Sequence, residues 1–267
     1  MSDNESPDKK DRPLPGAWDR NPYEAPTAHV RDVKTPIDDT LAAEPNKVAA
    51  GRGVAWWKEG WGLFREAPGL WIGICVVLML INIAMPLVPI IGGLATSLLF
   101  PVFGAGLILG CRSLESDETL AFGHLFAGFQ NNFGRLLAVG ALYLLGLIII
   151  FIPVGFGIGF FAGTAGGGDA GLLFAILVGA LLAIPLFMSI WFAPALVALH
   201  DLTAFEAMKL SFRACLRNLL PFLIYGLALI VLAVLATLPI GLGWLLLMPV
   251  AVCSLYASYR DIFTGGH

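Results

Sequence analysis

One pattern occurs three times in this chain: an aromatic amphipathic stretch, followed by a charge-free hydrophobic hairpin with proline and glycine at its bend. The register is clearest in three pairs of aromatic residues, each pair seven positions apart: Trp57/Phe64, Phe122/Phe129 and Phe205/Phe212. Repetition at this scale means that each unit buries its hydrophobic face against its neighbours. We therefore predict three repeated units, at about residues 54–112, 117–200 and 202–262, each an interfacial amphipathic helix plus a helical hairpin.

Long uncharged runs place these hairpins in a membrane. Runs without Asp, Glu, Lys or Arg cover residues 67–111, 136–168, 170–200 and 218–259. A spanning helix needs ~20 apolar residues, so the first and last runs each hold two spans and the middle runs hold one each. The predicted fold is an all-α integral membrane protein with six transmembrane helices, near 69–88, 91–110, 136–156, 171–199, 219–238 and 242–259.

The basic residues after position 50 all fall on one side of this six-span arrangement. They are Arg52, Lys58, Arg65, Arg112, Arg135, Lys209, Arg213, Arg217 and Arg260. The three turns on the opposite side contain no Lys or Arg. Because cytoplasmic loops carry an excess of positive charge, this distribution predicts a multi-pass protein with both termini in the cytoplasm.

The first 50 residues differ in composition from the six-span membrane domain of residues 51–262. They hold 10 acidic and 7 basic residues and show no hydrophobic periodicity, which predicts a disordered cytoplasmic tail. No apolar stretch follows Met1, so no cleaved signal peptide is expected. The segment from Trp18 to Pro26 either docks on a protein partner in an extended form or serves as a plain tether. The net charge of −3 lies mostly in this tail and indicates no nucleic-acid partner.

Aromatic side chains are concentrated just before the predicted hairpins, where amphipathic rings suit the headgroup layer of a bilayer. In the first stretch, Trp57, Trp61 and Phe64 share one helical face,. The predicted interfacial anchors are Trp56, Trp57, Trp61, Phe64, Phe122, Phe129, Phe205 and Phe212.

The third aromatic stretch combines a helix-start signal with a row of positive charges. Thr203 and Glu206 have the spacing of a capping box. The helix that they start is expected to turn its apolar residues inward: Phe205, Met208, Phe212 and Leu216. At four-residue intervals it carries three basic residues, here called the basic stripe: Lys209, Arg213 and Arg217. Like charges at this spacing repel one another, so the stripe either binds an anionic lipid headgroup or serves as a positive-inside anchor without lipid selectivity.

Chemistry that depends on ionisable groups has no support inside the predicted spans. No Asp, Glu, Lys, Arg or His lies well within any of them, whereas coupled pumps need such groups. His200 and Asp201 point about 100° apart on a helix, so we interpret them as an interfacial side chain and a helix-start residue. His124 is isolated, and the cysteines have no metal-ligand spacing: Cys75, Cys111, Cys215 and Cys253,. We therefore expect no enzyme, no metal site and no cofactor.

Small residues at four-residue spacing have two interpretations. Gly155, Gly159 and Gly163 fit either a closely packed helix or an external loop,. Gly106 and Gly110 form a second pair of this kind and predict a close approach of backbones,.

A resemblance to a known family rests on the segment from Pro194 to Arg213, which includes His200-Asp201-Leu-Thr-Ala-Phe-Glu206. This segment resembles the recurring cassette of an uncharacterised bacterial six-span inner-membrane protein family. That family is similar to the non-catalytic membrane domain attached to some glycerophosphodiester phosphodiesterases. The segment Asn21–Pro26 also resembles an N-terminal tag of many bacterial membrane proteins. The resemblance implies a bacterial inner-membrane location and no established activity.

The leading hypothesis from the sequence is a non-enzymatic membrane organiser, a scaffold that binds lipids or partners. Its expected partners are membrane lipids, anionic ones in particular, and a protein bound through the tail; the sequence does not indicate an oligomeric state. The alternative is an uncoupled permease or channel for an apolar or lipid-like molecule, based on the repeats and on kinks expected at Pro185 and Pro194. A mid-membrane cavity lined by polar residues would favour it: Asn82, Thr96, Ser97, Thr237 or Ser254.

Overall fold

The computed structural model describes residues 40–89, 91–162 and 168–264. Within these ranges six helices are long and apolar enough to cross a membrane, and no strand is formed. They are α2 (Pro68–Ala84), α3 (Ile91–Glu115), α5 (Phe133–Ala162), α6 (Gly168–Trp191), α9 (Leu219–Thr237) and α10 (Trp244–Phe263). The one-turn helix η2 (Met85–Leu87) extends α2, and α7 (Ala193–His200) follows α6 after a break at Phe192. The six predicted spans are confirmed.

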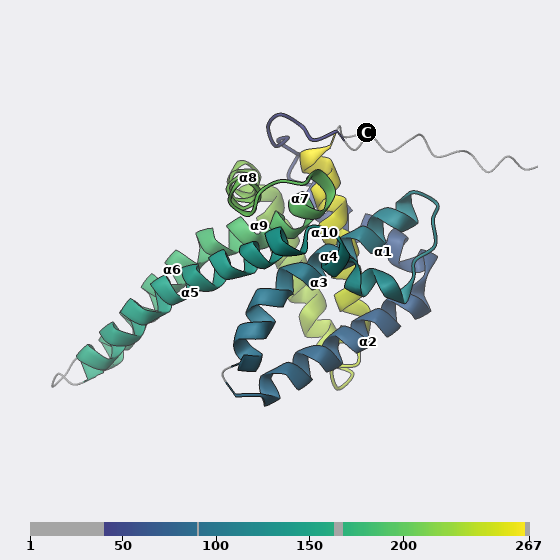
Figure 1. Cartoon of the computed structure of the whole chain (residues 1–267). Helices are drawn as coiled ribbons and strands as arrows, with labels where there is room; N and C mark the ends of the chain where they lie inside the picture. Colours follow the sequence, from purple (N-terminus) through teal and green to yellow (C-terminus); the bar gives the residue numbers. More distant parts are fainter. Residues whose placement is uncertain (1–39, 90, 163–167, 265–267) are drawn as a thin grey trace, which may run out of the picture. The chain divides into compact units, whose positions relative to one another are not determined.

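Three shorter elements precede the hairpins. They are α1 (Arg52–Glu66), the pair η3 (Phe122–Phe126) and α4 (Ala127–Gln130), and α8 (Ala204–Arg217). In Figure 1, α1, α7 and α8 lie at one end of the spans, and the last turns of α2, α5 and α9 lie at the other. We call the first of these the basic end, because the nine basic residues after position 50 belong to α1, to α8 or to the span termini there.

Each short element packs mainly on the hairpin that precedes it in the chain. The η3–α4 pair contacts α3, the second helix of the first hairpin, and α8 contacts α6, the second helix of the second hairpin. The first element, α1, has no preceding hairpin and packs instead on α9 and α10, the last one. The three contacts therefore follow one another in a cycle that joins the start of the described membrane unit to its end.

Glycines permit two of these contacts. A Cβ on Gly60 of α1 would lie 2.5 Å from the backbone nitrogen of Ser254 in α10. A Cβ on Gly106 of α3 would lie 2.4 Å from the carbonyl oxygen of His124 in η3. The close approach predicted at Gly106 is therefore present, against a 3₁₀ segment rather than against another span.

The glycine run near the second bend is helical but not closely packed. α5 continues to Ala162, so Gly155 and Gly159 are in a helix and the loop interpretation is wrong for them. A Cβ on either residue would meet nothing within 4 Å, so the prediction of close packing is also wrong. Gly163 lies outside the described residues.

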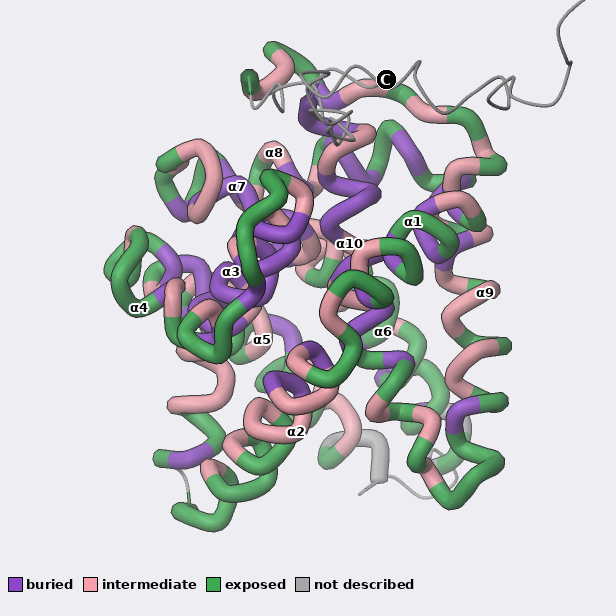
Figure 2. The backbone as a smooth tube through the Cα atoms, turned by 90° about the vertical axis from the view of Figure 1, so that its right-hand side faces the viewer, coloured by how far each residue is buried: buried purple, intermediate pink, exposed green. Residues whose placement is uncertain are grey.

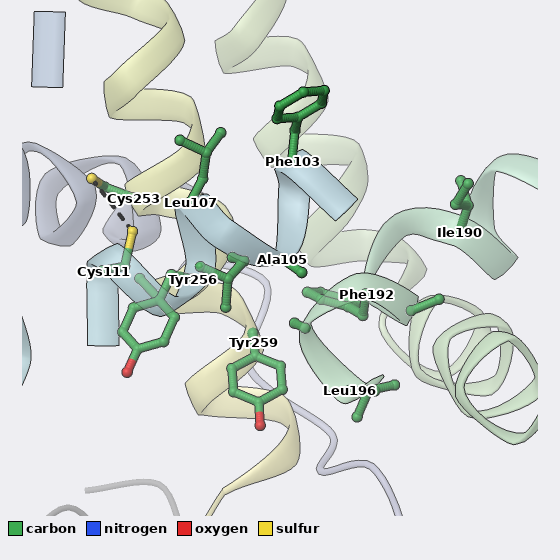
Figure 3. Packing of buried hydrophobic residues seen from close by; sticks show 14 of the residues in the cluster. Phe103, Ala105, Leu107, Cys111, Ile190, Phe192, Leu196, Cys253, Tyr256 and Tyr259 are labelled. Atoms are coloured by element: carbon green, nitrogen blue, oxygen red, sulfur yellow. Dashed lines mark hydrogen bonds between the residues drawn. The ribbon is translucent and has the colours of Figure 1, made fainter. Parts of the chain in front are cut away.

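The protein core lies where α3, α7 and α10 meet. Figure 2 shows buried backbone concentrated there, whereas α2, α5, α6 and α9 are largely exposed or half-buried and have apolar side chains available to lipid. Figure 3 shows Cys111 of α3 facing Cys253 of α10, with their sulfur atoms 3.8 Å apart. The four cysteines are buried free thiols and pack as small apolar side chains.

Residues 40–50, assigned from the sequence to the tail, are bonded to the membrane domain. The backbone N–H groups of Ala42 and Asn46 donate to the carbonyls of Phe263 and Ile262. These carbonyls belong to the last turn of α10 and have no partner within the helix, so the segment caps α10. The Val48 N–H donates to Asn218 Oδ1 at the α8–α9 junction, 2.9 Å away. We call residues 40–50 the capping strap; the first 39 residues lie outside the described part.

Candidate functional site

The amphipathic helix α8 is attached to the bundle through small side chains. Its buried residues are Ala204, Ala207, Ser211, Ala214 and Cys215. The prediction that Phe205 and Leu216 point inward is wrong, because their exposed fractions are 69% and 47%. In a membrane, lipid is as apolar as a protein core, so helices pack through small residues and leave large apolar side chains to the lipid.

The start of α8 is fixed by the predicted capping box. Thr203 Oγ1 accepts from the Glu206 N–H, and the Thr203 N–H donates to Glu206 Oε2 at 3.2 Å. The hydrogen bonds from Thr203 lower the pKa of the Glu206 carboxyl, since they favour its ionised form,. The capping box of the sequence prediction is confirmed.

A buried hydroxyl group of α8 occupies the break between α6 and α7. Ser211 Oγ accepts from the Phe192 N–H at 3.0 Å and donates to the Met188 carbonyl at 2.7 Å. In an uninterrupted helix this N–H and this carbonyl would bond to each other, four residues apart. A side chain inserted into the ladder bends a helix, and Pro194 lies in the first turn of the next helix, which begins at Ala193. Ser211 therefore fixes both the kink and the position of α8 on it.

The basic stripe lies on the exposed side of α8. Lys209, Arg213 and Arg217 are all exposed. Arg217 also forms an ion pair with Glu44 of the capping strap, 2.7 Å from Nη1 to Oε2. Helix geometry places the centre of the stripe about 150° from the buried face and about 70° from the exposed side of Phe205 and Leu216. α8 therefore presents an apolar side and a cationic side to its surroundings.

An apolar groove of about 590 Å³ lies between α6 and α9. α6 contributes Phe187, Met188 and Trp191, and α9 contributes Phe222, Leu223 and Gly226 among others. Cys215 of α8 lines the groove at its basic end. Burial raises the pKa of its thiol to about 12, so the thiol is neutral at physiological pH,. The groove is therefore apolar, and one of its ends lies against α8.

A cluster of ion pairs joins α1, α3 and α10 at the basic end. Arg52 pairs with Asp261 and, at 2.8 Å, with Glu59, while the Trp56 indole N–H donates to Asp261 Oδ2 at 2.7 Å. Arg260 pairs with Glu115 of α3. The hydrogen bond to Asp261 raises the pKa of Arg52, and burial raises the pKa of Glu59 despite its cationic neighbour.

This cluster lines a cavity of about 830 Å³ together with the capping strap. Its carboxylates accept from groups of the protein itself, including the Tyr256 hydroxyl on Glu115 at 2.7 Å. No set of His, Cys, Asp or Glu among the described residues could hold a metal ion. The cluster therefore ties helices together. It was not predicted from the sequence, where Arg52 and Arg260 indicate only topology.

The histidine and aspartate that end the fourth span have separate roles. His200 bonds the Tyr259 hydroxyl of α10. Asp201 adopts a left-handed conformation, with φ of 54°, and ends α7. Its carbonyl accepts from Arg135. The prediction that Asp201 starts a helix is therefore wrong, because Thr203 has that role.

The predicted aromatic anchors fall into two groups in the structure. Trp56, Trp57 and Phe64 are buried within the protein, where Trp57 stacks on Tyr225 of α9 at 4.8 Å between ring centroids. The others reach the surface or are half-buried: Trp61, Phe122, Phe129, Phe205 and Phe212. Position 57 therefore packs against protein, whereas its counterparts 122 and 205 face outward.

Comparison with known proteins identifies a relative. A probable inner membrane protein of Burkholderia thailandensis is 32% identical to this chain, in an alignment that covers 81% of this chain and 93% of that protein. The chain belongs to this family of inner membrane proteins. Together with the six apolar helices, the relationship makes the chain a multi-pass inner membrane protein. No protein-family model matches the sequence, and no solved structure matches it. The resemblance to the membrane domain of some phosphodiesterases stays a prediction.

Proposed function

We propose that this inner membrane protein is a non-enzymatic organiser of membrane lipids, with the basic stripe of α8 as its headgroup-binding site. The observation that supports this function best is the orientation of α8. The face of α8 that carries small residues is bonded to the bundle through Ser211, and its apolar and cationic sides are both exposed. A helix with these two exposed sides lies in the interface and attracts anionic headgroups. In this proposal, partner proteins bind the first 39 residues, which lie outside the described part of the chain.

The proposal includes an orientation with the basic end in the cytoplasm. Its support is the location of all nine basic residues after position 50 at that end, because basic residues are retained on the cytoplasmic side. We expect a membrane-impermeant maleimide to label Leu242→Cys, in the exposed α9–α10 turn, in intact spheroplasts. Val54→Cys in α1 should be labelled only after permeabilisation. The four native thiols are buried and give little background. The reverse labelling pattern would refute the orientation.

We further propose that the three helical units are structural repeats. Two contacts support this view because they occupy matching positions. Gly60, three residues after Trp57, meets Ser254, which follows Pro249 by five residues. Leu125, three residues after Phe122, meets Gly106, which follows Pro101 by five residues. In this proposal, the differing burial of positions 57, 122 and 205 reflects different surroundings of equivalent residues.

The headgroup site is tested by removing the stripe. The triple variant Lys209→Gln, Arg213→Gln, Arg217→Gln should bind phosphatidylglycerol up to about a hundredfold more weakly in native mass spectrometry, because each basic residue near an anionic surface contributes about 1 kcal/mol. Lys58→Gln, Arg65→Gln is the control, compared with the double variant Arg213→Gln, Arg217→Gln: it removes two basic charges from exposed positions of α1, away from α8. Equal retention by the wild type and the stripe variant would leave the stripe as a topological anchor only.

An uncoupled permease is the second candidate. A cavity of about 290 Å³ between α2 and α3 includes Asn82 and Thr96 in its lining. These polar groups are bonded within their own helices, Asn82 to the Leu78 carbonyl at 2.9 Å and Thr96 to the Gly92 carbonyl at 2.8 Å. They offer a passing molecule little beyond an apolar surface, so we rank this function below lipid organisation.

A further inference from the structure

The capping strap places a carboxylate on the basic stripe. Glu44 Oε2 lies 2.7 Å from Arg217 Nη1, at the C-terminal end of α8. Within the described ranges, this is the one ion pair that the three stripe residues form. The strap therefore occupies one of the three cations on which the proposed headgroup site depends.

Hydrogen bonds on both sides of Glu44 fix its backbone. The Ala42 and Asn46 N–H groups donate to carbonyls of α10 at 2.8 and 2.7 Å. Asn218, the residue after the paired arginine, donates from Nδ2 to the Asn46 carbonyl at 2.9 Å. An exposed ion pair usually loses part of its energy in ordering two long side chains. Here the backbone that carries the carboxylate is already ordered, beside the end of α8.

The strap is bound less firmly than the core. Pro45 is the one buried residue among positions 40–50, and the strap's bonds to α10 are at the end of that helix, where water also serves as a partner for the last carbonyls. Segments with few buried apolar contacts open at lower free energy than the core. Opening would remove Glu44 from Arg217 and leave α8 in place, because Ser211 holds this helix on the bundle.

A phosphate at the same arginine conflicts with the closed strap. Carboxylates and phosphates are both ligands of a guanidinium group. Two anions at one cation also repel each other, even where they bond to different nitrogens. If the closed strap lowers the affinity for a lipid by some factor, the bound lipid favours the open strap by the same factor, since coupling between two binding equilibria is reciprocal.

We propose that the capping strap competes with anionic phospholipids for Arg217, so that strap closure weakens headgroup binding at the basic stripe and a bound headgroup favours the open strap. This inference rests on the proposed lipid-organising function and gives the headgroup site an internal regulator. It assigns the strap a role beyond capping α10.

Removing the carboxylate should strengthen lipid binding. Glu44→Gln should bind phosphatidylglycerol up to about fivefold more tightly in native mass spectrometry, the factor that corresponds to ~1 kcal/mol, the upper value for an exposed ion pair. The same substitution should have no effect in the Arg217→Gln background, which lacks the shared cation. Asp117→Asn is the matched control and should also have no effect: it removes one negative charge from the exposed turn after α3, and asparagine tolerates the positive φ of 58° there,.

Hydrogen exchange of the strap tests the reciprocal effect. In nanodiscs, phosphatidylglycerol should speed exchange of the Ala42 and Asn46 amides by the same factor relative to phosphatidylcholine, and Glu44→Gln should abolish this difference. Inorganic phosphate added to phosphatidylcholine nanodiscs should leave the exchange unchanged, because no acyl chain holds it at the interface. An equal effect of inorganic phosphate would overturn the assignment to a lipid.

The outcomes separate this inference from the function on which it rests. If Glu44→Gln binds phosphatidylglycerol like the wild type, or if this lipid leaves strap exchange unchanged, the competition fails, while weak binding by the triple stripe variant still supports the headgroup site. If Glu44→Gln has the same effect with and without Arg217, or if Asp117→Asn has an equal effect, the gain is a general consequence of surface charge and the inference is overturned. If the triple stripe variant binds as tightly as the wild type, the headgroup function itself fails.

Discussion

Replacing Glu115 by alanine should lower the free energy of unfolding by about 3 kcal/mol, the lower end of the range for breaking a buried ion pair. Glu115 and Arg260 have exposed fractions of only 17% and 18%, and the Tyr256 hydroxyl also donates to Glu115. The variant leaves the Arg260 guanidinium in a poorly hydrated position without its carboxylate. Unfolding in mixed micelles, followed by circular dichroism, measures the difference.

Two further variants show whether the loss comes from the uncompensated charge. Glu115→Ala combined with Arg260→Met should recover much of the stability, because replacing a buried pair with apolar groups is often neutral. Glu44→Ala breaks the exposed pair with Arg217 and should change stability by less than ~1 kcal/mol,. A double variant as unstable as Glu115→Ala alone would show that the packing of Glu115, rather than the charge of Arg260, accounts for the loss.

The spans could be predicted from the sequence because their signal is local. Twenty uncharged residues in a row specify a helix in lipid whatever surrounds it. The capping box at Thr203 was predictable for the same reason, since its two partners are three residues apart. The end of α7 was not, because Asp201 takes a left-handed conformation that depends on bonds to the distant Asn132 and Arg135.

The orientation of α8 was mispredicted for a physical reason. The sequence pattern predicts that its large apolar residues point inward, as in a water-soluble protein, where burial in the core removes them from water. Beside a membrane, lipid receives Phe205 and Leu216 equally well, and the protein side goes to alanines that allow close packing,. The groove could not be predicted from the sequence either. Its width depends on how α6, α8 and α9 pack together, and no single segment determines that packing.

The ion-pair cluster could not be predicted because its partners are remote in sequence. Arg52 and Asp261 are far apart along the chain, and Glu115 meets Arg260 only when α3 and α10 pack together. The available signal was that acidic residues accompany basic ones at several helix ends. The capping strap was hidden by its composition, which resembles that of the rest of the tail. Its bonds to α10 arise because the last helical carbonyls need donors,.

Replacing Gly60 by alanine should lower the free energy of unfolding by about 1–3 kcal/mol, the usual cost of overpacking. The new Cβ would lie 2.5 Å from the nitrogen and 2.8 Å from the Cα of Ser254. Both are backbone atoms of α10, so no side-chain rotation relieves the clash, and α1 must move away from the last hairpin. That movement also loosens the Trp56 contact with Asp261 and the stacking of Trp57 on Tyr225.

Gly62, two residues later in α1, provides the matched control. It is exposed, and a Cβ there would meet nothing within 4 Å. Gly62→Ala should therefore raise stability by ~0.5–1 kcal/mol, since alanine loses less backbone entropy than glycine in a helix. Opposite signs at two glycines of one helix follow only if α1 is docked on α10. Equal effects of the two substitutions would contradict the closure of the last hairpin by the first helix, and with it the cyclic order of contacts that supports the repeat proposal.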